Sequence, residues 1–107
     1  MARKTVELTH EAAFIIEKMG IRIKKARLRR NIRADVLAEQ AGISKGTLSS
    51  IEKGVPTVSI GAYAAVLCAL DMENDFDLVA VDEEGKQSYR ELHLHHRKRA
   101  TKQNNNK

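Results

Sequence analysis

The stretch Val36–Gly54, VLAEQAGISKGTLSSIEKG, decides the fold. Leu37 and Ala41 recur at helical spacing and predict a short helix with a small apolar face. Gly42 can adopt the left-handed conformation that ends a helix, and Ile43 is placed to fill the corner behind it. We therefore expect a helix that ends in a tight turn before a second helix begins.

The second half of this stretch predicts a helix with one polar face. Ser44 is a suitable N-cap, and only Leu48 and Ile51 are large apolar residues in the turns that follow. The remaining positions hold small or hydrogen-bonding residues: Lys45, Gly46, Thr47, Ser49 and Ser50. Because this face is polar without being a run of charge, it suits the base edges of a DNA groove. The two helices together predict a helix-turn-helix whose second helix is free to enter such a groove.

Length and composition favour one small all-α domain. A chain of 107 residues has room for one packed domain with tails, and two Phe, two Tyr and no Trp require an aliphatic core. A single cysteine excludes an intramolecular disulfide, and no apolar run reaches the roughly 18 residues that a membrane span needs. The first residues lack the apolar region of a signal peptide, so we expect a cytoplasmic protein with no membrane contact.

Charge is divided into three blocks along the chain. Residues 1–56 carry 12 Lys or Arg and 6 Asp or Glu, residues 57–87 carry 1 and 7, and residues 88–107 carry 6 and 1. A basic front half that contains a helix-turn-helix indicates a phosphate-binding surface, whereas the acidic block should face away from DNA. That acidic block either docks a second protein or only keeps a basic protein in solution.

The region Gly20–Leu70 resembles the Xre/Cro-type helix-turn-helix domain of bacterial and phage repressors. The resemblance rests on IKKAR, LAEQAGIS and TLSSIEKG, followed by a closing apolar helix. It implies a lambda-repressor-like bundle of four to five helices that binds a palindromic operator in double-stranded DNA as a homodimer, associated with the bacterial nucleoid. The continuation PTVSIGAYAAVLCALDMENDFDLVAVD resembles HipB-like antitoxins, which implies a HipA-like kinase toxin as partner. The alternatives are a stand-alone Xre-family regulator and a protein-binding module with weak DNA affinity.

The resemblance also assigns roles to single residues. It implies base contacts from the first two turns of the second helix, that is from Ser44, Lys45, Gly46, Thr47, Ser49 and Ser50. Lys45 is the best candidate for reading guanine, and the alternative is that it touches only phosphate.

Two further roles follow from the resemblance. Phosphate contacts are expected from Arg33 and Lys53. Arg33 and Ala34 stand where the family usually has Ser or Thr followed by Gln, so the phosphate clamp of this chain has a different chemistry. Arg27 and Glu52 occupy the positions of a structural ion pair that joins the first helix to the second helix of the motif.

The chain is expected to divide into three parts. Residues 1–18 are an N-terminal arm and helical extension, residues 19–82 the DNA-binding domain, and residues 83–107 a basic disordered tail. From an N-cap at Thr9, apolar residues at three- and four-residue spacing run towards Arg30, as one helix or as two that meet at Gly20. These apolar residues are Phe14, Ile15, Met19, Ile23 and Ala26.

The segment FDLVAV predicts a β-strand, because it is short, rich in β-favouring side chains and bounded by acidic clusters. A lone strand cannot satisfy its own backbone, so we expect it to pair with a second copy of the chain. The strand residues are Asp77, Leu78, Val79, Ala80 and Val81. The alternative is a short fifth helix over residues 71–82.

No catalytic residue, cofactor or metal is expected. The sequence offers no paired carboxylates, no nucleophile beside a base and no Gly-rich phosphate loop, which argues against an enzyme. His93, His95 and His96 have no second ligand cluster and fit a flexible cationic tail better than a metal site. Cys68 and Ile60 belong to the closing apolar helix, and we expect both to be buried.

Overall fold

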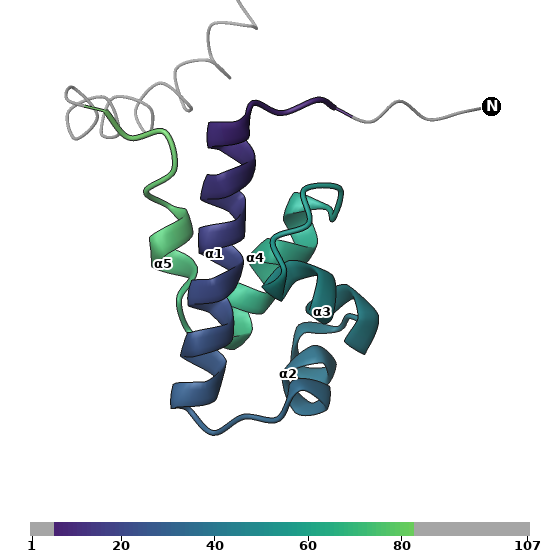
Figure 1. Ribbon diagram of the computed structural model, residues 1–107. Helices are drawn as coiled ribbons and strands as arrows, with labels where there is room; N and C mark the ends of the chain where they lie inside the picture. The colour runs from purple at the N-terminus through teal and green to yellow at the C-terminus, as the bar shows by residue number, and fades with distance from the viewer. Residues whose placement is uncertain (1–5, 83–107) are drawn as a thin grey trace, which may run out of the picture. The chain divides into compact units, whose positions relative to one another are not determined.

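The computed structural model describes residues 6–82, and this part of the chain is helical without any strand (Figure 1). Its helices are α1 (His10–Arg29), α2 (Ala34–Ala41), α3 (Lys45–Glu52), α4 (Ile60–Ala69) and α5 (Glu73–Phe76). All five lie in the unit that ends at Phe76, and Asp77 opens a second unit. The expectation of an all-α helix-turn-helix fold is confirmed.

The first helix, α1, is continuous. Thr9 is its N-cap, and the Thr9 hydroxyl accepts a hydrogen bond of 3.0 Å from the backbone N–H of Ala12. Asn31 follows the C-cap with φ 56°, the left-handed conformation that Asn tolerates at the end of a helix. Because α1 runs through Gly20 unbroken, the single-helix alternative is the right one.

Two glycines allow α1 to lie directly against the end of α3. A Cβ on Gly20 would lie 2.6 Å from the carbonyl oxygen of Ile51 and 2.8 Å from that of Glu52. Gly54 has φ 73°, and a Cβ there would lie 2.5 Å from Cα of Glu17. Neither position has room for a side chain, so these glycines fix where α3 ends against the middle of α1.

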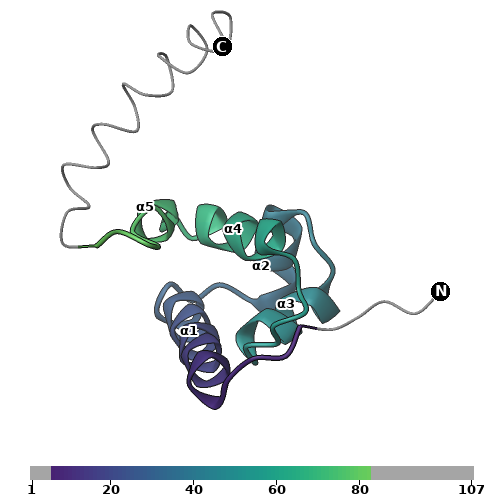
Figure 2. The same ribbon diagram turned by 90° about the horizontal axis from the view of Figure 1, so that it is seen from above.

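The core is aliphatic, as the composition predicts. α1 and α2 each pack against α3, α2 also packs against α4, and α5 packs against α4 (Figure 2). Tyr63 is the one aromatic residue among the buried core residues that the structure describes, and its hydroxyl donates a 2.8 Å hydrogen bond to the carbonyl of Val55. The buried apolar residues are Ile23, Ala26, Leu37, Ala38, Leu48, Ile51, Tyr63, Val66, Leu67 and Leu70.

The turn between α2 and α3 has the expected geometry. Gly42 is left-handed at φ 74°, and the backbone N–H of Ile43 donates a 2.9 Å hydrogen bond to the carbonyl of Ala38. Ile43 is partly buried against the core. Ser44 then caps α3, so the helix-turn-helix predicted from Val36–Gly54 is confirmed.

The prediction of a β-strand over Asp77–Val81 is wrong. Residues 77–80 form a turn, in which Ala80 has φ 69° and the N–H of Val81 donates a 3.2 Å hydrogen bond to the carbonyl of Leu78. A left-handed residue is incompatible with an extended strand. The β-favouring side chains led to a wrong prediction because a strand also needs a partner strand for its backbone. Here the backbone instead forms a hydrogen bond within a turn.

Several residues expected to be buried are exposed. Cys68 is exposed on α4, and the side chain of Ile60 is 70% exposed. Phe14 and Ile15 on α1 are 58% and 56% exposed; Phe14 is nine residues before the buried Ile23, which places it on the opposite side of the helix. The spacing of apolar residues therefore predicted too many buried residues, because both α1 and α4 carry apolar residues on more than one face.

Some expectations cannot be compared with the structure. The basic tail, residues 83–107, and its histidines His93, His95 and His96 lie outside the described residues. No helix between residues 6 and 82 is both long enough and apolar enough to cross a membrane.

Candidate nucleic-acid interface

The start of α3 is fixed by two residues that were predicted to touch bases. The Ser44 hydroxyl accepts a 3.0 Å hydrogen bond from the backbone N–H of Thr47 and donates one of 3.0 Å to the Thr47 hydroxyl. Thr47 is also half-buried. These two side chains therefore build the helix cap, and only the exposed Ser44 has much of its surface available to a ligand.

The outer face of α3 is formed by Lys45, Gly46 and Ser49, which are all exposed. Their spacing of three and four residues places them side by side, and Lys53 continues the same face one turn later. Ser50 lies beside them and is half-buried. The structure thus brings the predicted base-contacting and phosphate-contacting residues of α3 onto one surface.

Gly46 leaves this surface open at its centre. A Cβ built on Gly46 would meet only the Ser44 hydroxyl oxygen, at 3.8 Å, so the fold itself does not require glycine there. A glycine in an exposed helix costs stability relative to alanine, on the order of 1 kcal/mol. The open space would allow the backbone of α3 to approach a ligand closely.

Arg33 lies at the start of α2 and is occupied by a neighbouring carboxylate. Its Nε and Nη2 atoms lie 3.0 Å and 2.9 Å from the carboxylate oxygens of Asp35. This hydrogen-bonded pairing raises the pKa of Arg33 and lowers the pKa of Asp35. A phosphate that binds Arg33 must therefore compete with Asp35 for the guanidinium group.

Asp35 lies in the first turn of α2, where the charge of Lys45 at the start of α3 also acts on it. The positive charge of Lys45, on α3, also contributes to lowering the pKa of Asp35, after the larger effect of Arg33. The sequence analysis did not identify Asp35 as part of the site. The sequence did contain a sign of this contact, because an aspartate two residues after an arginine at the start of a helix can reach the arginine side chain.

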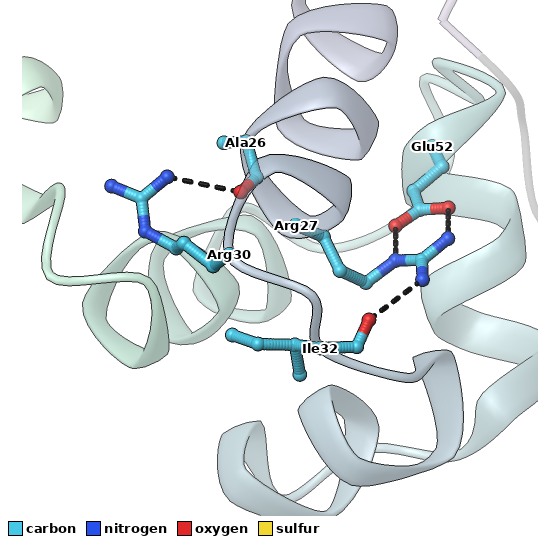
Figure 3. A network of polar contacts seen from close by, with 5 residues as sticks. All are labelled: Ala26, Arg27, Arg30, Ile32 and Glu52. Carbon is cyan, nitrogen blue, oxygen red and sulfur yellow. Dashed lines mark hydrogen bonds and ion pairs between the residues drawn. The ribbon is translucent and has the colours of Figure 1, made fainter.

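The expected ion pair between Arg27 and Glu52 is present and joins α1 to α3 (Figure 3). Arg27 Nε lies 2.7 Å from Glu52 Oε2, and Arg27 Nη2 lies 3.2 Å from Oε1. The third donor, Nη1, reaches the carbonyl of Ile32 at 3.0 Å. Both charged side chains are only 10% exposed, and the hydrogen bonds to Glu52 raise the pKa of Arg27. The pair holds α3 against α1 and takes no part in the outer surface of α3.

The polar outer face of α3 and the capped turn before it are the features of a helix-turn-helix, and a family model agrees. The model, described as Helix-turn-helix, matches residues 23–73. Residues 23–73, which are 51 of the 107 residues, are similar to this family. The match begins within α1 and ends at the first residue of α5, so it includes α2, α3 and α4 and the last seven residues of α1. No curated protein matches the chain.

Proposed function

We propose that this protein is a sequence-specific DNA-binding transcriptional repressor that reads its operator with α3. The observation that carries the proposal is the exposed polar face of α3 within a matched helix-turn-helix domain. The family is one of DNA-binding domains, and that coarser assignment rests on the match to residues 23–73. We propose beyond it that the protein represses transcription, that it reads operator bases, and that the residues named below make the contacts.

Lys45 is placed to give sequence discrimination. An ammonium group in the major groove can donate to the O6 and N7 acceptors of guanine, a contact worth about 1–3 kcal/mol of discrimination. Gly46 would let the backbone approach the base edges, and Ser49 can donate to or accept from a base. Ser44, Thr47 and Ser50 form the edge of this surface.

Arg33 and Lys53 would hold the phosphate backbone on either side of the base-reading face. Arg33 is the N-cap residue of α2, and its side chain makes no capping hydrogen bond to that helix. A phosphate that displaces the Asp35 carboxylate from Arg33 would therefore meet both the guanidinium group and the first N–H groups of α2. Contacts to phosphate would set the register of the protein on DNA without reading sequence.

The direct test is selection of bound duplexes from a random pool, followed by titration of the selected duplex and a scrambled one at several salt concentrations. We expect the selected duplex to bind at least about a thousandfold more tightly than the scrambled one, as specific operators do. Equal and weak binding of both duplexes would contradict the proposal and favour the protein-binding module. Catalysis is not part of the proposal.

We also propose that the repressor is a HipB-like antitoxin whose partner is a HipA-like kinase toxin. The chemical support is an acidic surface around α5, where Asp71, Glu73 and Asp75 are all exposed. Carboxylates of this kind would be repelled by DNA phosphate and attracted by a basic protein surface. The alternative role of these carboxylates is solubility.

The partner proposal is tested by co-expression with the product of a neighbouring kinase-like gene. We expect a stable complex that the triple charge reversal D71K/E73K/D75K weakens, and that a control reversal at Glu39, exposed on α2, leaves intact. The absence of such a gene, or a complex insensitive to the reversal, would leave the stand-alone regulator as the better interpretation.

A further inference from the structure

A row of cations runs along α1 and is not used by the proposed DNA contacts. Lys18, Arg22, Lys25 and Arg29 follow one another at spacings of four, three and four residues, so they lie on one face of the helix. The last three are exposed, and Lys18 is half-buried. Glu11 lies on the same face seven residues before Lys18, so the row ends there. These four cations are called the basic row.

The basic row faces away from α3. Gly20 and Arg27 mark the side of α1 that meets α3, as the close approach at Gly20 and the ion pair of Arg27 show. Each cation of the row is two positions from Gly20 or from Arg27, which is about 200° around an α-helix. Figure 2, which looks along α1, shows none of the other described helices on the side of α1 opposite α3. The row is thus turned away from the helix that is proposed to read DNA.

The charge of the basic row is not balanced within the described part of the fold. Residues 18–34 include eight Lys or Arg and no Asp or Glu. The ion pairs within residues 6–82 use Arg27 and Arg33, so the row has no carboxylate partner there. Like charges three or four residues apart on a helix repel each other. A bound polyanion would relieve this repulsion.

Two ordinary roles of surface charge do not account for the basic row. The dipole of α1 favours cations in its last turn, which explains Arg29 but none of the other three. Solubility is served by charges of both signs mixed together, whereas this face carries one sign from Lys18 to Arg29. A face of one sign, on a chain that resembles DNA-binding domains, instead fits the phosphate backbone of DNA.

We propose that the basic row binds the phosphate backbone of a second stretch of duplex DNA, separate from the stretch that lies on α3. The row extends over eleven residue steps, roughly 16 Å of helix, which corresponds to about five phosphates of one DNA strand. These contacts are independent of sequence, because phosphates carry no sequence information. The choice of DNA as partner rests on the proposed function, whereas the row itself needs no operator base. The protein thereby holds two stretches of DNA together.

A matched pair of variants tests whether the basic row contacts phosphate. R22Q/K25Q removes two cations of the row, and K24Q/R30Q removes two exposed cations that lie off it, so both variants have the same net charge. Each is titrated against a long scrambled duplex at several salt concentrations, after far-UV circular dichroism has confirmed unchanged helicity. We expect R22Q/K25Q to bind about tenfold more weakly and to reduce the salt slope by about two units, and K24Q/R30Q to stay within about threefold of the original chain.

Two outcomes of this titration would overturn the proposal. Equal losses for the two variants would show a general attraction between charges, without a site on one face of α1. Unchanged binding by R22Q/K25Q would show that the row does not touch phosphate, and it would leave an acidic protein as the partner of matching charge. Because the titration needs no operator, its result is separate from whether α3 reads sequence.

Capture of a second duplex tests whether the basic row is a separate site. The protein is first bound to bead-attached operator, and a labelled scrambled duplex is then added. We expect the original chain and K24Q/R30Q to retain the label, and R22Q/K25Q to retain about tenfold less while it still binds the operator. Equal retention by R22Q/K25Q would assign the second duplex to another surface. Either that result or no retention by the original chain would overturn the proposal.

Discussion

Two arginine–carboxylate pairs of similar geometry lie in very different surroundings. In the pair Arg27–Glu52 the shortest distance is 2.7 Å and both side chains are 10% exposed. In the pair Arg33–Asp35 the shortest distance is 2.9 Å, and the side chains are 77% and 45% exposed. The first pair joins residues 25 positions apart in the sequence, the second residues only two positions apart.

The difference in burial decides what each pair can do. Loss of Glu52 would leave the guanidinium group of Arg27 largely shielded from water and without a counterion, which is costly. The side chain of Arg33 is largely exposed, so it can exchange the carboxylate of Asp35 for a phosphate at little cost. The buried pair therefore holds α3 in place, and the exposed Arg33 is accessible to a ligand.

The largest effect is expected from Glu52→Ala. Removing one partner of this largely buried pair should lower the free energy of unfolding by about 3 kcal/mol, measured by urea denaturation. Asp35→Ala is the matched control, and we expect only a slight change in the midpoint because that pair is exposed. Equal losses for the two variants would show that burial does not distinguish the pairs.

The next largest effect is expected from Gly20→Ala. The new methyl group would lie within 2.6 Å of the Ile51 carbonyl oxygen, so α1 and α3 must move apart. We expect a loss of about 2 kcal/mol, as for other overpacked sites, measured in the same denaturation experiment. Gly46→Ala is the control and should keep or raise stability, because its Cβ meets nothing closer than 3.8 Å. A stable Gly20→Ala variant would mean that the crossing of α1 and α3 is looser than described.

The sequence predicted the helix-turn-helix well because its signals are local. The left-handed Gly42 and the caps at Thr9 and Ser44 depend on residues within one or two turns, and the structure has each of them. The pairing of Arg27 with Glu52, in contrast, was expected only from the resemblance, because nothing local brings residues 25 positions apart together.

The errors arose where the answer depends on distant parts of the molecule. The side chains of FDLVAV favour a strand, but whether a strand forms depends on a partner for its backbone. Apolar spacing along α1 did not show which of its apolar residues are covered, because that depends on where α3 packs. The close approach at Gly20 was missed for the same reason, since sequence alone does not show what faces a glycine.

A smaller effect is expected from the exposed pair on DNA binding. Arg33→Ala should weaken all duplexes alike and reduce the salt dependence of binding by about one unit, because one phosphate contact is lost. Asp35→Asn should strengthen binding to all duplexes and increase the salt dependence, since it frees Arg33 to contact phosphate. Titration of a scrambled duplex at several salt concentrations measures both changes. If both variants bind like the original chain, Arg33 does not touch phosphate.

The smallest effect is expected on the pH dependence of stability. The pKa of Asp35 is lowered in the fold from its ordinary value of 3.8, so the unfolded chain takes up this proton first as the pH falls. The stabilisation from the pair is thus complete above that value and is lost as the pH falls through the lower pKa of the folded state. Unfolding of the original chain and Asp35→Asn should differ slightly at pH 7 and converge in acid. A difference that grows in acid would contradict this sign.

The central claim is that α3 reads sequence through Lys45, and one comparison of variants tests it most directly. The original chain, Lys45→Ala and Lys53→Ala are each titrated against the selected operator and a set of single-base variants of it. We predict that Lys45→Ala loses about 1–3 kcal/mol of discrimination at one guanine position and that Lys53→Ala weakens every duplex by the same factor. If Lys45→Ala also weakens every duplex equally and leaves the ranking of the variants unchanged, Lys45 touches only phosphate and the claim is wrong.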